Sequence, residues 1–211
     1  MQDQRTATQP QDGPAQAVPA WAQEVLEFWF GAPGSAEAGQ ARREWFIKSD
    51  AFDALIRTRF GELIATALDG GLDDWEQGSA QAQLARILVL DQFTRNVLRG
   101  TPQAFAGDAR ALAAARRMVD SGLDQALAPL QRAFVYLPFE HAEDSAMQER
   151  AVALFAALAT SSPGFDEMLD YARRHRDVIA RFGRFPHRNE ILGRDSTADE
   201  TDFLRQPGSR F

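Results

Sequence analysis

From residue 19 onward, apolar residues recur along most of the chain at spacings of three and four. The stripe Phe52, Ile56, Phe60 and Ile64 is typical of an amphipathic helix. Residues 79–99 are apolar nearly all round, which predicts a central, buried helix. The same spacing predicts further helices over residues 19–31, 37–48, 52–70, 108–121, 127–137, 139–159 and 164–182.

A short last helix is predicted after Ser196, because Thr197 and Glu200 have the spacing of a capping box. No alternating apolar and polar run is long enough for a pair of strands. With 36 alanines, the chain is rich in the best helix former. We therefore expect an all-α fold, an antiparallel stack or bundle of about eight to nine helices, in one domain over residues 19–211.

The N-terminus is predicted to be a disordered leader over residues 1–18. Its first 17 residues contain no Leu, Ile, Val or Phe, so they lack the apolar core of a signal peptide. The chain also has no apolar run of the roughly 18 residues that a membrane-spanning helix needs. Together with the absence of cysteine, this favours a cytoplasmic protein.

Charge narrows the classes of function. The 30 acidic and 23 basic residues give a net charge of -7, which argues against nucleic acid or an anionic membrane as the main partner. Lys48 is the only lysine, so Schiff-base and P-loop chemistry could use no other site. Without cysteine, disulfides, thiolate nucleophiles and cysteine-bound metals are excluded.

Charged residues interrupt the apolar pattern of the segment 79–99. Asp91 and Arg95 lie four residues apart at positions that the stripe assigns to the interior, and Asn96 and Arg99 occupy the same two turns. Burying charge is costly unless the charge is paired. These residues are therefore either an internal ion pair that ties helices together or part of a ligand site.

His141 interrupts a second stripe, just beyond the kink expected at Pro138. With Glu143 or Asp91 as an orienting acid, it could act as a general base. A metal centre would need further ligands that the spacing does not supply, so neither a metal nor another cofactor is predicted. The alternative is a hydrogen-bonded core histidine.

His175 interrupts a third stripe and stands in a basic segment. The segment from Arg173 to Arg194 contains seven arginines but only two acidic residues, Asp177 and Glu190. Its local charge is therefore about +5, in a chain that is acidic overall. Alternating arginine and phenylalanine around a Gly and a Pro could form an anion site or a rigid brace. The candidate ligand-binding residues are Arg95, Asn96, Arg99, His175, Arg181, Arg184, His187, Arg188, Asn189 and Arg194.

Several motifs together resemble a known bacterial family. They are Leu90-Asp91-Gln92-Phe93 with Arg95-Asn96, Tyr136-Leu137-Pro138-Phe139 with His141, and the run from Arg181 to Asn189 followed by Leu192-Gly193-Arg194. Over about residues 21–206 the chain resembles the domain-of-unknown-function 924 family. The resemblance implies a fold similar to tetratricopeptide-repeat helical stacks, and no established activity. Thr94 stands where that family usually has proline, which in a helix would cause a kink.

These observations support three hypotheses. The first is a pocket between helices for a small ligand bearing a phosphate or a carboxylate, with His141 and Glu143 or Asp91 performing metal-independent acid–base catalysis. The second is an interaction module that binds an acidic peptide in an arginine-lined groove. The third is a set of buried polar networks that only fix the packing. The sequence does not decide whether the protein is an enzyme, and gives no oligomeric state.

Overall fold

The computed structural model describes residues 18–73 and 77–209, and within these ranges it contains helices and turns but no strand. The predicted all-α class is therefore confirmed. The leader predicted over residues 1–18 lies outside the described residues, except for Val18. The α-helices are α1 (Ala20–Phe30), α2 (Asp50–Leu68), α3 (Ala80–Ile87), α4 (Thr94–Val97), α5 (Asp108–Asp120), α6 (Pro129–Glu140), α7 (Ser145–Ser161), α8 (Asp166–Phe182) and α9 (Ala198–Leu204).

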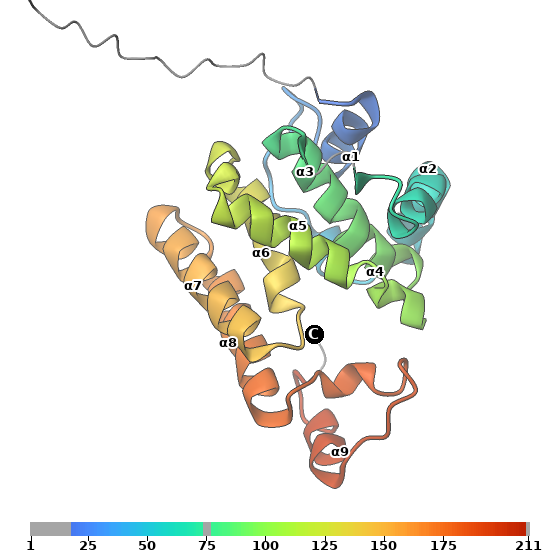
Figure 1. Ribbon diagram of the computed structural model, residues 1–211, viewed down its shortest axis with the longest axis vertical. Coiled ribbons are helices and arrows are strands. Elements are labelled where there is room, and N and C mark those ends of the chain that lie inside the picture. Colours follow the sequence, from blue (N-terminus) through green and yellow to red (C-terminus); the bar gives the residue numbers. More distant parts are fainter. Residues whose placement is uncertain (1–17, 74–76, 210–211) are drawn as a thin grey trace, which may run out of the picture.

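The helices stack largely in chain order (Figure 1). Helices α1 and α5 both pack against α3, α6 packs on α5, and α7 lies between α6 and α8. At the other end of the molecule from α1, α9 contacts a short turn of helix that comes after α8. The short turns are η1 (Arg43–Trp45), η3 (Leu88–Phe93), η4 (Pro102–Phe105), η5 (Leu123–Ala126) and η6 (Pro186–Arg188).

Helix α3 and the turn η3 form the centre of the core, as the apolar pattern predicts. Leu84, Ile87, Leu88 and Leu90 have no exposed surface. The predicted helix 79–99 is not regular, however: η3 is a π-helix that connects α3 to α4. Such widened turns often occur at functional sites, and here the turn contains Asp91.

Side chains bind the carbonyl groups of the π-helix. The Thr94 hydroxyl donates to the carbonyl of Leu90 at 2.8 Å, and Arg95 Nη1 donates to that of Asp91 at 2.9 Å. The backbone of Gly107 packs so closely that a Cβ there would lie 2.1 Å from the Leu90 carbonyl oxygen. Thr94 thus supplies a hydroxyl donor to this widened turn.

The helix predicted over residues 37–48 is wrong. Only η1 forms, because this segment has no continuous apolar stripe and Gly34 and Gly39 adopt positive φ. Trp45 anchors the segment instead. Its ring stacks on Trp29, with centroids 5.7 Å apart, and meets Phe134 edge-on at 4.9 Å.

The predicted boundary between helices 127–137 and 139–159 is also wrong. Helix α6 continues through Pro138 to Glu140, and α7 begins only at Ser145. The buried Gln148 amide donates to the carbonyls of Glu140 and Ala142 at 2.6 and 2.8 Å, so a side chain satisfies the end of α6. His141 consequently caps the C-terminus of α6 rather than lying within a helix.

The predicted capping box before α9 is confirmed. The backbone amide of Glu200 donates to the Thr197 hydroxyl at 3.2 Å, and that of Thr197 donates to the Glu200 carboxylate at 2.8 Å.

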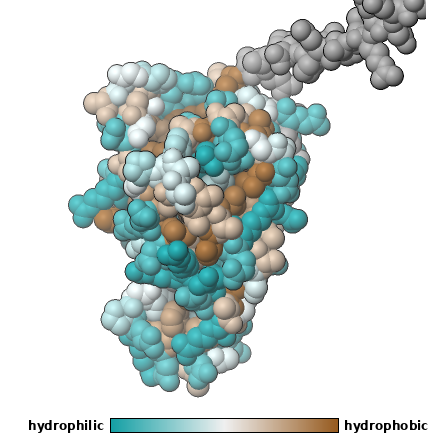
Figure 2. Space-filling view, turned by 90° about the vertical axis from the view of Figure 1, so that its left-hand side faces the viewer, coloured by the Kyte–Doolittle hydropathy of each residue, from teal (hydrophilic) through white to brown (hydrophobic). Residues whose placement is uncertain are grey.

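On the face shown in Figure 2, hydrophobic patches lie between hydrophilic residues. In the part of the chain that the structure describes, no helix is both long and apolar enough to cross a membrane.

Candidate functional site

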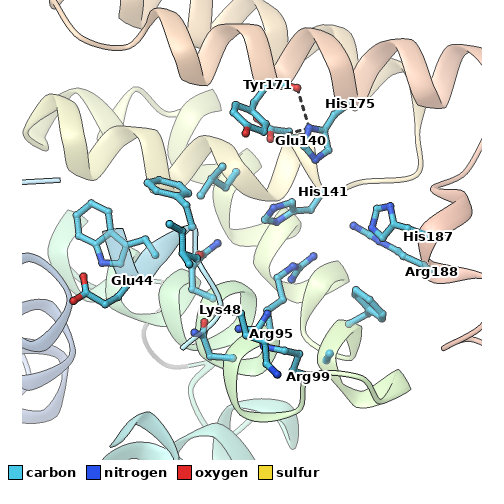
Figure 3. A pocket seen from close by; sticks show the side chains of 18 of the residues that line it. Glu44, Lys48, Arg95, Arg99, Glu140, His141, Tyr171, His175, His187 and Arg188 are labelled. Carbon is cyan, nitrogen blue, oxygen red and sulfur yellow. Dashed lines mark hydrogen bonds and ion pairs between the residues drawn. The ribbon is translucent and has the colours of Figure 1, made fainter. Parts of the chain in front are cut away.

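A pocket of about 590 Å³ lies between the segment Glu44–Lys48, α4 with the turn that follows it, the C-terminus of α6, the first half of α8, and η6 (Figure 3). All three histidines of the chain and its only lysine line this pocket. A volume of this order suits a small organic ligand. Of the predicted site residues, the pocket brings together Arg95, Asn96, Arg99, His141, His175, His187 and Arg188.

Asp91 lies directly behind the pocket wall and orients His141. Oδ1 of Asp91 is 2.7 Å from Nδ1 of His141 and 3.1 Å from Nη1 of Arg95. Burial would raise the pKa of Asp91, but His141 and Arg95 outweigh it and hold that pKa well below its usual range. The ionised carboxylate can only accept hydrogen bonds, so Nδ1 of His141 carries the proton and Nε2 is an acceptor.

His141 is neutral near pH 7. Burial and the positive charge of Arg95 lower the pKa of its imidazole, although Asp91 acts in the opposite direction. A neutral imidazole whose Nδ1–H is held by a buried carboxylate is the arrangement of a general base. Asp91 would stabilise the imidazolium that forms when Nε2 takes up a proton.

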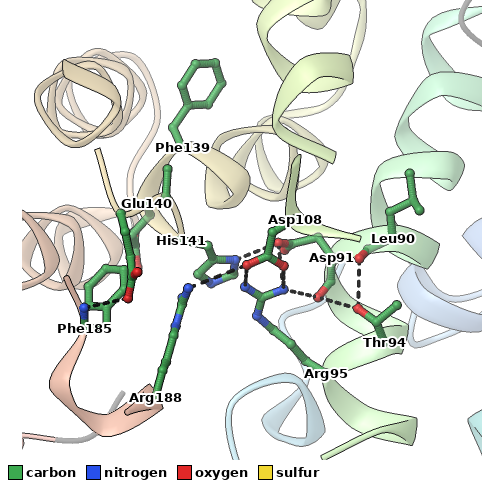
Figure 4. A network of polar contacts seen from close by, with 12 residues as sticks. Leu90, Asp91, Thr94, Arg95, Asp108, Phe139, Glu140, His141, Phe185 and Arg188 are labelled. Carbon is green, nitrogen blue, oxygen red and sulfur yellow. Dashed lines mark hydrogen bonds and ion pairs between the residues drawn. The ribbon is translucent and has the colours of Figure 1, made fainter. Parts of the chain in front are cut away.

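Asp108 links two arginines at the pocket (Figure 4). Arg95 binds it through both terminal nitrogens, Nη1 at 2.7 Å and Nη2 at 2.9 Å. Arg188 approaches the same carboxylate at 3.6 Å. Since Arg95 is saturated by Asp91 and Asp108, Arg188 has only a share of one carboxylate.

Arg188 is a buried cation with incomplete compensation. Its guanidinium lies between the rings of Phe105 and Phe185, 4.8 and 4.5 Å from their centroids, and the residue is 7% exposed. Its Nε is buried without a hydrogen-bond partner. Burial and the neighbouring Arg95 lower the pKa of Arg188 to about 10. An anion in the pocket could accept a hydrogen bond from this guanidinium.

Glu140 and His175 form a neutral pair on another wall. His175 Nδ1 lies 2.9 Å from the Tyr171 carbonyl oxygen and 3.1 Å from Oε1 of Glu140. Burial, with Asp91 adding to it, raises the pKa of Glu140 to about 8, and burial lowers the pKa of His175 to about 3. At neutral pH the contact is therefore a hydrogen bond between uncharged groups, and Glu140 still holds a transferable proton.

Asn96 and the remaining cations of the pocket are already paired with carboxylates. Asn96 donates to Asp53 at 2.8 Å, and Arg99 Nε donates to the same carboxylate at 3.0 Å. Lys48 Nζ lies 3.1 Å from Asp50. The pocket thus contains several positive groups, but their charges are largely neutralised, and Arg188 stands out among them.

Glu143 does not contact His141, contrary to the expectation that it orients this histidine. Its carboxylate binds both terminal nitrogens of Arg194, at 2.6 and 2.9 Å, and accepts the backbone amide of Phe185 at 2.8 Å. Burial acts to raise the pKa of Glu143, but these hydrogen bonds lower it, so the group is ionised. Glu143 and Arg194 therefore hold the C-terminal segment against the loop after α6.

Other predicted site residues, Arg181, Arg184 and Asn189, also make their contacts within this C-terminal segment. Arg184 binds Glu200 through Nε and Nη2, at 2.6 and 2.8 Å, and its hydrogen bonds lower the pKa of Glu200 to about 2. Asn189 donates to Ser196 at 3.0 Å and accepts from Arg194 at 3.0 Å. Arg181 lies over Phe182. We call Glu143, Arg184, Asn189, Arg194 and Glu200 the bracing network.

The sequence pattern does not identify Asp108 or the segment Glu44–Lys48 as parts of the site, and it marks Glu140 only as a carboxylate that flanks His141. Asp108 begins α5, where an acidic residue is expected for helix stability alone. Glu140 precedes His141, but its burial depends on the end of α6. The apolar spacing predicts a helix for the segment Glu44–Lys48, and no local signal places it at a pocket.

The described residues offer acid–base chemistry and anion binding. Within residues 18–73 and 77–209, no three side chains of His, Asp or Glu come together in a way that would bind a metal ion. The pocket does contain an acceptor at His141, a protonated carboxyl at Glu140 and an undercompensated cation at Arg188. These three groups could hold an anionic molecule and move protons to and from it.

Comparisons with known proteins agree with this fold and leave the activity open. No match was found among curated proteins. A solved structure of a protein of unknown function from Agrobacterium tumefaciens is 40% identical, with a TM-score of 0.76 over 88% of this chain and 97% of that chain. Residues 25–208 match the family described as bacterial protein of unknown function (DUF924). The chain belongs to the DUF924 family.

Proposed function

We propose that the pocket binds a small anionic metabolite and that His141 acts on it as a general base, without a metal ion. The observation that carries this proposal is the contact of 2.7 Å between the buried carboxylate of Asp91 and Nδ1 of His141. This contact fixes the protonated nitrogen away from the pocket and leaves a basic nitrogen for the ligand.

Each of the three pocket groups has a separate task. Arg188 binds the anionic group of the ligand, since its buried charge is shared with only one carboxylate at 3.6 Å. Nε2 of His141 accepts a proton from the ligand or from a bound water molecule. Glu140, with a pKa of about 8, is protonated at neutral pH and can donate to a leaving or developing negative oxygen. Asp91 is a positioning residue.

Proton nuclear magnetic resonance in D₂O tests the proposal, because it detects any new product signal and any exchanged C–H proton. The full chain is incubated with mixtures of small carboxylates and phosphate esters. Exchange of a C–H proton or appearance of a product signal identifies a substrate. We expect His141→Gln to slow the change by about 100-fold or more, as removal of a general base does.

Arginine variants separate specific anion binding from a general charge effect. Arg188→Met should abolish the rise in melting temperature that the same compounds cause. Arg205→Met is the matched control, because Arg205 is exposed and pairs with Asp202 on α9. Equal melting-temperature shifts in both variants would remove Arg188 from the site. Unchanged turnover in His141→Gln would contradict the proposed base.

The interaction module is the second hypothesis and makes a different prediction. If an acidic peptide were the ligand, peptides bearing several Asp or Glu residues should bind in a salt-dependent manner and leave the D₂O assay unchanged. Free small anions would then compete with such peptides only weakly.

A further inference from the structure

The pocket changes in character from its inner wall to its mouth. The inner wall holds Glu140, His175 and Arg188, all buried. The described chain exposes four large hydrophobic residues, and three of them line the same pocket: Phe46, Ile47 and Tyr171. In Figure 3, Glu44 lies on the side opposite His187 and Arg188, and Tyr171 lies beside Glu140 and His175. Exposed apolar groups gathered at one pocket indicate a binding surface.

The segment that contains Phe46 and Ile47, at the entrance of the pocket, is anchored to the core. Trp45 is buried and stacked on Trp29, while Phe46, the next residue, is 62% exposed. Anchoring Trp45 therefore fixes Phe46 and Ile47 at the rim. Keeping a phenylalanine in water is unfavourable, and a ligand with an apolar part would cover it.

The inner wall indicates the charge of the ligand. Arg95 is saturated by Asp91 and Asp108, and Arg99 is paired with Asp53. Among these arginines only Arg188 has a nitrogen buried without a hydrogen-bond partner. Because Asp91 and Asp108 formally balance Arg95 and Arg188, the inner wall has no excess positive charge that would favour a dianion. Glu140, protonated at neutral pH, can donate a hydrogen bond to an anionic oxygen. These groups suit a carboxylate better than a doubly charged phosphate.

We propose that the ligand is a monocarboxylate with an apolar body, its carboxylate bound by Arg188 beside His141 and its body packed against Phe46, Ile47 and Tyr171. This inference rests on the proposed function and names the substrate class of the same pocket. The apolar body is either an alkyl chain or an aromatic ring.

Isothermal titration calorimetry of the full chain at constant salt tests this substrate class. The probes are octanoate, 3-phenylpropionate, acetate, octyl phosphate and octanol. Octanoate or 3-phenylpropionate should bind at least tenfold more tightly than acetate, since each methylene group that leaves water tightens binding by roughly fourfold. Which of the two binds more tightly distinguishes a chain from a ring. Octyl phosphate should bind at least tenfold more weakly than octanoate, and octanol should not bind detectably.

Variants of the pocket test which residues bind the carboxylate and which bind the apolar body of the ligand. Arg188→Met should weaken octanoate binding to the level of octanol. Phe46→Ser should reduce the advantage of octanoate over acetate to less than half while leaving acetate binding unchanged. Leu55→Ser is the matched control, because Leu55 is 47% exposed on α2 but does not line the pocket. It should bind every probe as the wild type does.

Several results would overturn the substrate class. Acetate or phosphate binding as tightly as octanoate, in an Arg188-dependent way, would refute the apolar body and leave the anion pocket intact. Equal binding of octanol would refute the carboxylate. Equal effects of Phe46→Ser and Leu55→Ser would refute the role of the rim. Absence of binding by every probe would refute this inference, while the D₂O assay with His141→Gln decides the proposed function by itself.

Discussion

Nδ1 of His141 lies 2.7 Å from Oδ1 of Asp91, a residue with no exposed surface. The two residues are 50 positions apart and come from a π-helix and from the C-terminal cap of α6. Their contact orients the imidazole of His141. It also joins the central helix of the core to the end of α6.

The tautomer of His141 is the first testable consequence. In the wild type, nitrogen-15 spectra near pH 7 should show neutral His141 with its proton on Nδ1, assigned by comparison with His141→Gln. In Asp91→Asn the carboxylate no longer fixes this proton, and the population should move toward the Nε2–H form that free imidazole prefers. An Nε2–H signal in the wild type would contradict the geometry.

Glu140 should make stability depend on pH. Its folded pKa of about 8 lies above the usual value of 4.5, so the folded state retains a proton that the unfolded state has released. Its contribution to the free energy of unfolding is complete below about pH 4.5 and is lost as the pH rises toward 8, by at most about 1.4 kcal/mol per pH unit. Glu140→Gln should remove this loss.

Urea titrations between pH 4.5 and 9 measure the effect of Glu140. The difference in unfolding free energy between Glu140→Gln and wild type should grow as the pH rises to about 8 and then level off. Glu149→Gln is the matched control, since Glu149 is exposed on α7. Parallel pH curves for Glu140→Gln and wild type would show that Glu140 ionises normally.

Gly107 is predicted to be essential to the π-helix. A Cβ at this position would lie 2.1 Å from the Leu90 carbonyl oxygen, so Gly107→Ala should cost about 1–3 kcal/mol of unfolding free energy through overpacking. Gly61→Ala is the control, because a Cβ there meets nothing within 4 Å in α2. It should stabilise the protein by up to about 1 kcal/mol, as alanine does in helices. Equal effects would contradict the close packing.

The bracing network should affect stability and leave the pocket intact. Arg194→Met removes two charge-assisted hydrogen bonds to Glu143 and should cost about 1–3 kcal/mol of unfolding free energy. Arg205→Met, which removes an exposed ion pair, should change stability by about 0.5 kcal/mol or less. Octanoate should raise the melting temperature of both variants as it does in the wild type. A loss of that rise in Arg194→Met would place this arginine in the binding site.

Local signals in the sequence predicted local structure well. The capping box of Thr197 and Glu200 depends on residues three apart, and the pattern of α3 depends on its own apolar residues. Both features could be predicted because neither depends on contacts with distant segments. The ion pair of Asp91 and Arg95 could likewise be predicted, because the two residues are only four positions apart.

Contacts between distant segments account for the features that could not be predicted. Glu143 is only two residues from His141, yet it binds Arg194. The reason is that α6 ends at Glu140 and a loop leads to α7, so the two side chains point in different directions. The prediction of a helix over residues 37–48 is wrong, and Trp45 is instead held by its stacking on Trp29, a contact with a distant segment. Sequence periodicity contains no information on either contact.

The π-helix also determines the rotational phase of α4. A π-turn behaves as one additional residue in an α-helix, and one residue corresponds to a rotation of about 100°. Residues before η3 therefore face the core, whereas Arg95, Asn96 and Arg99 face the pocket. Removing one residue between positions 88 and 93 would change the composition of this segment little but would turn Arg95 and Asn96 away from the pocket. The site is therefore encoded in the spacing of the chain as much as in the identity of its residues.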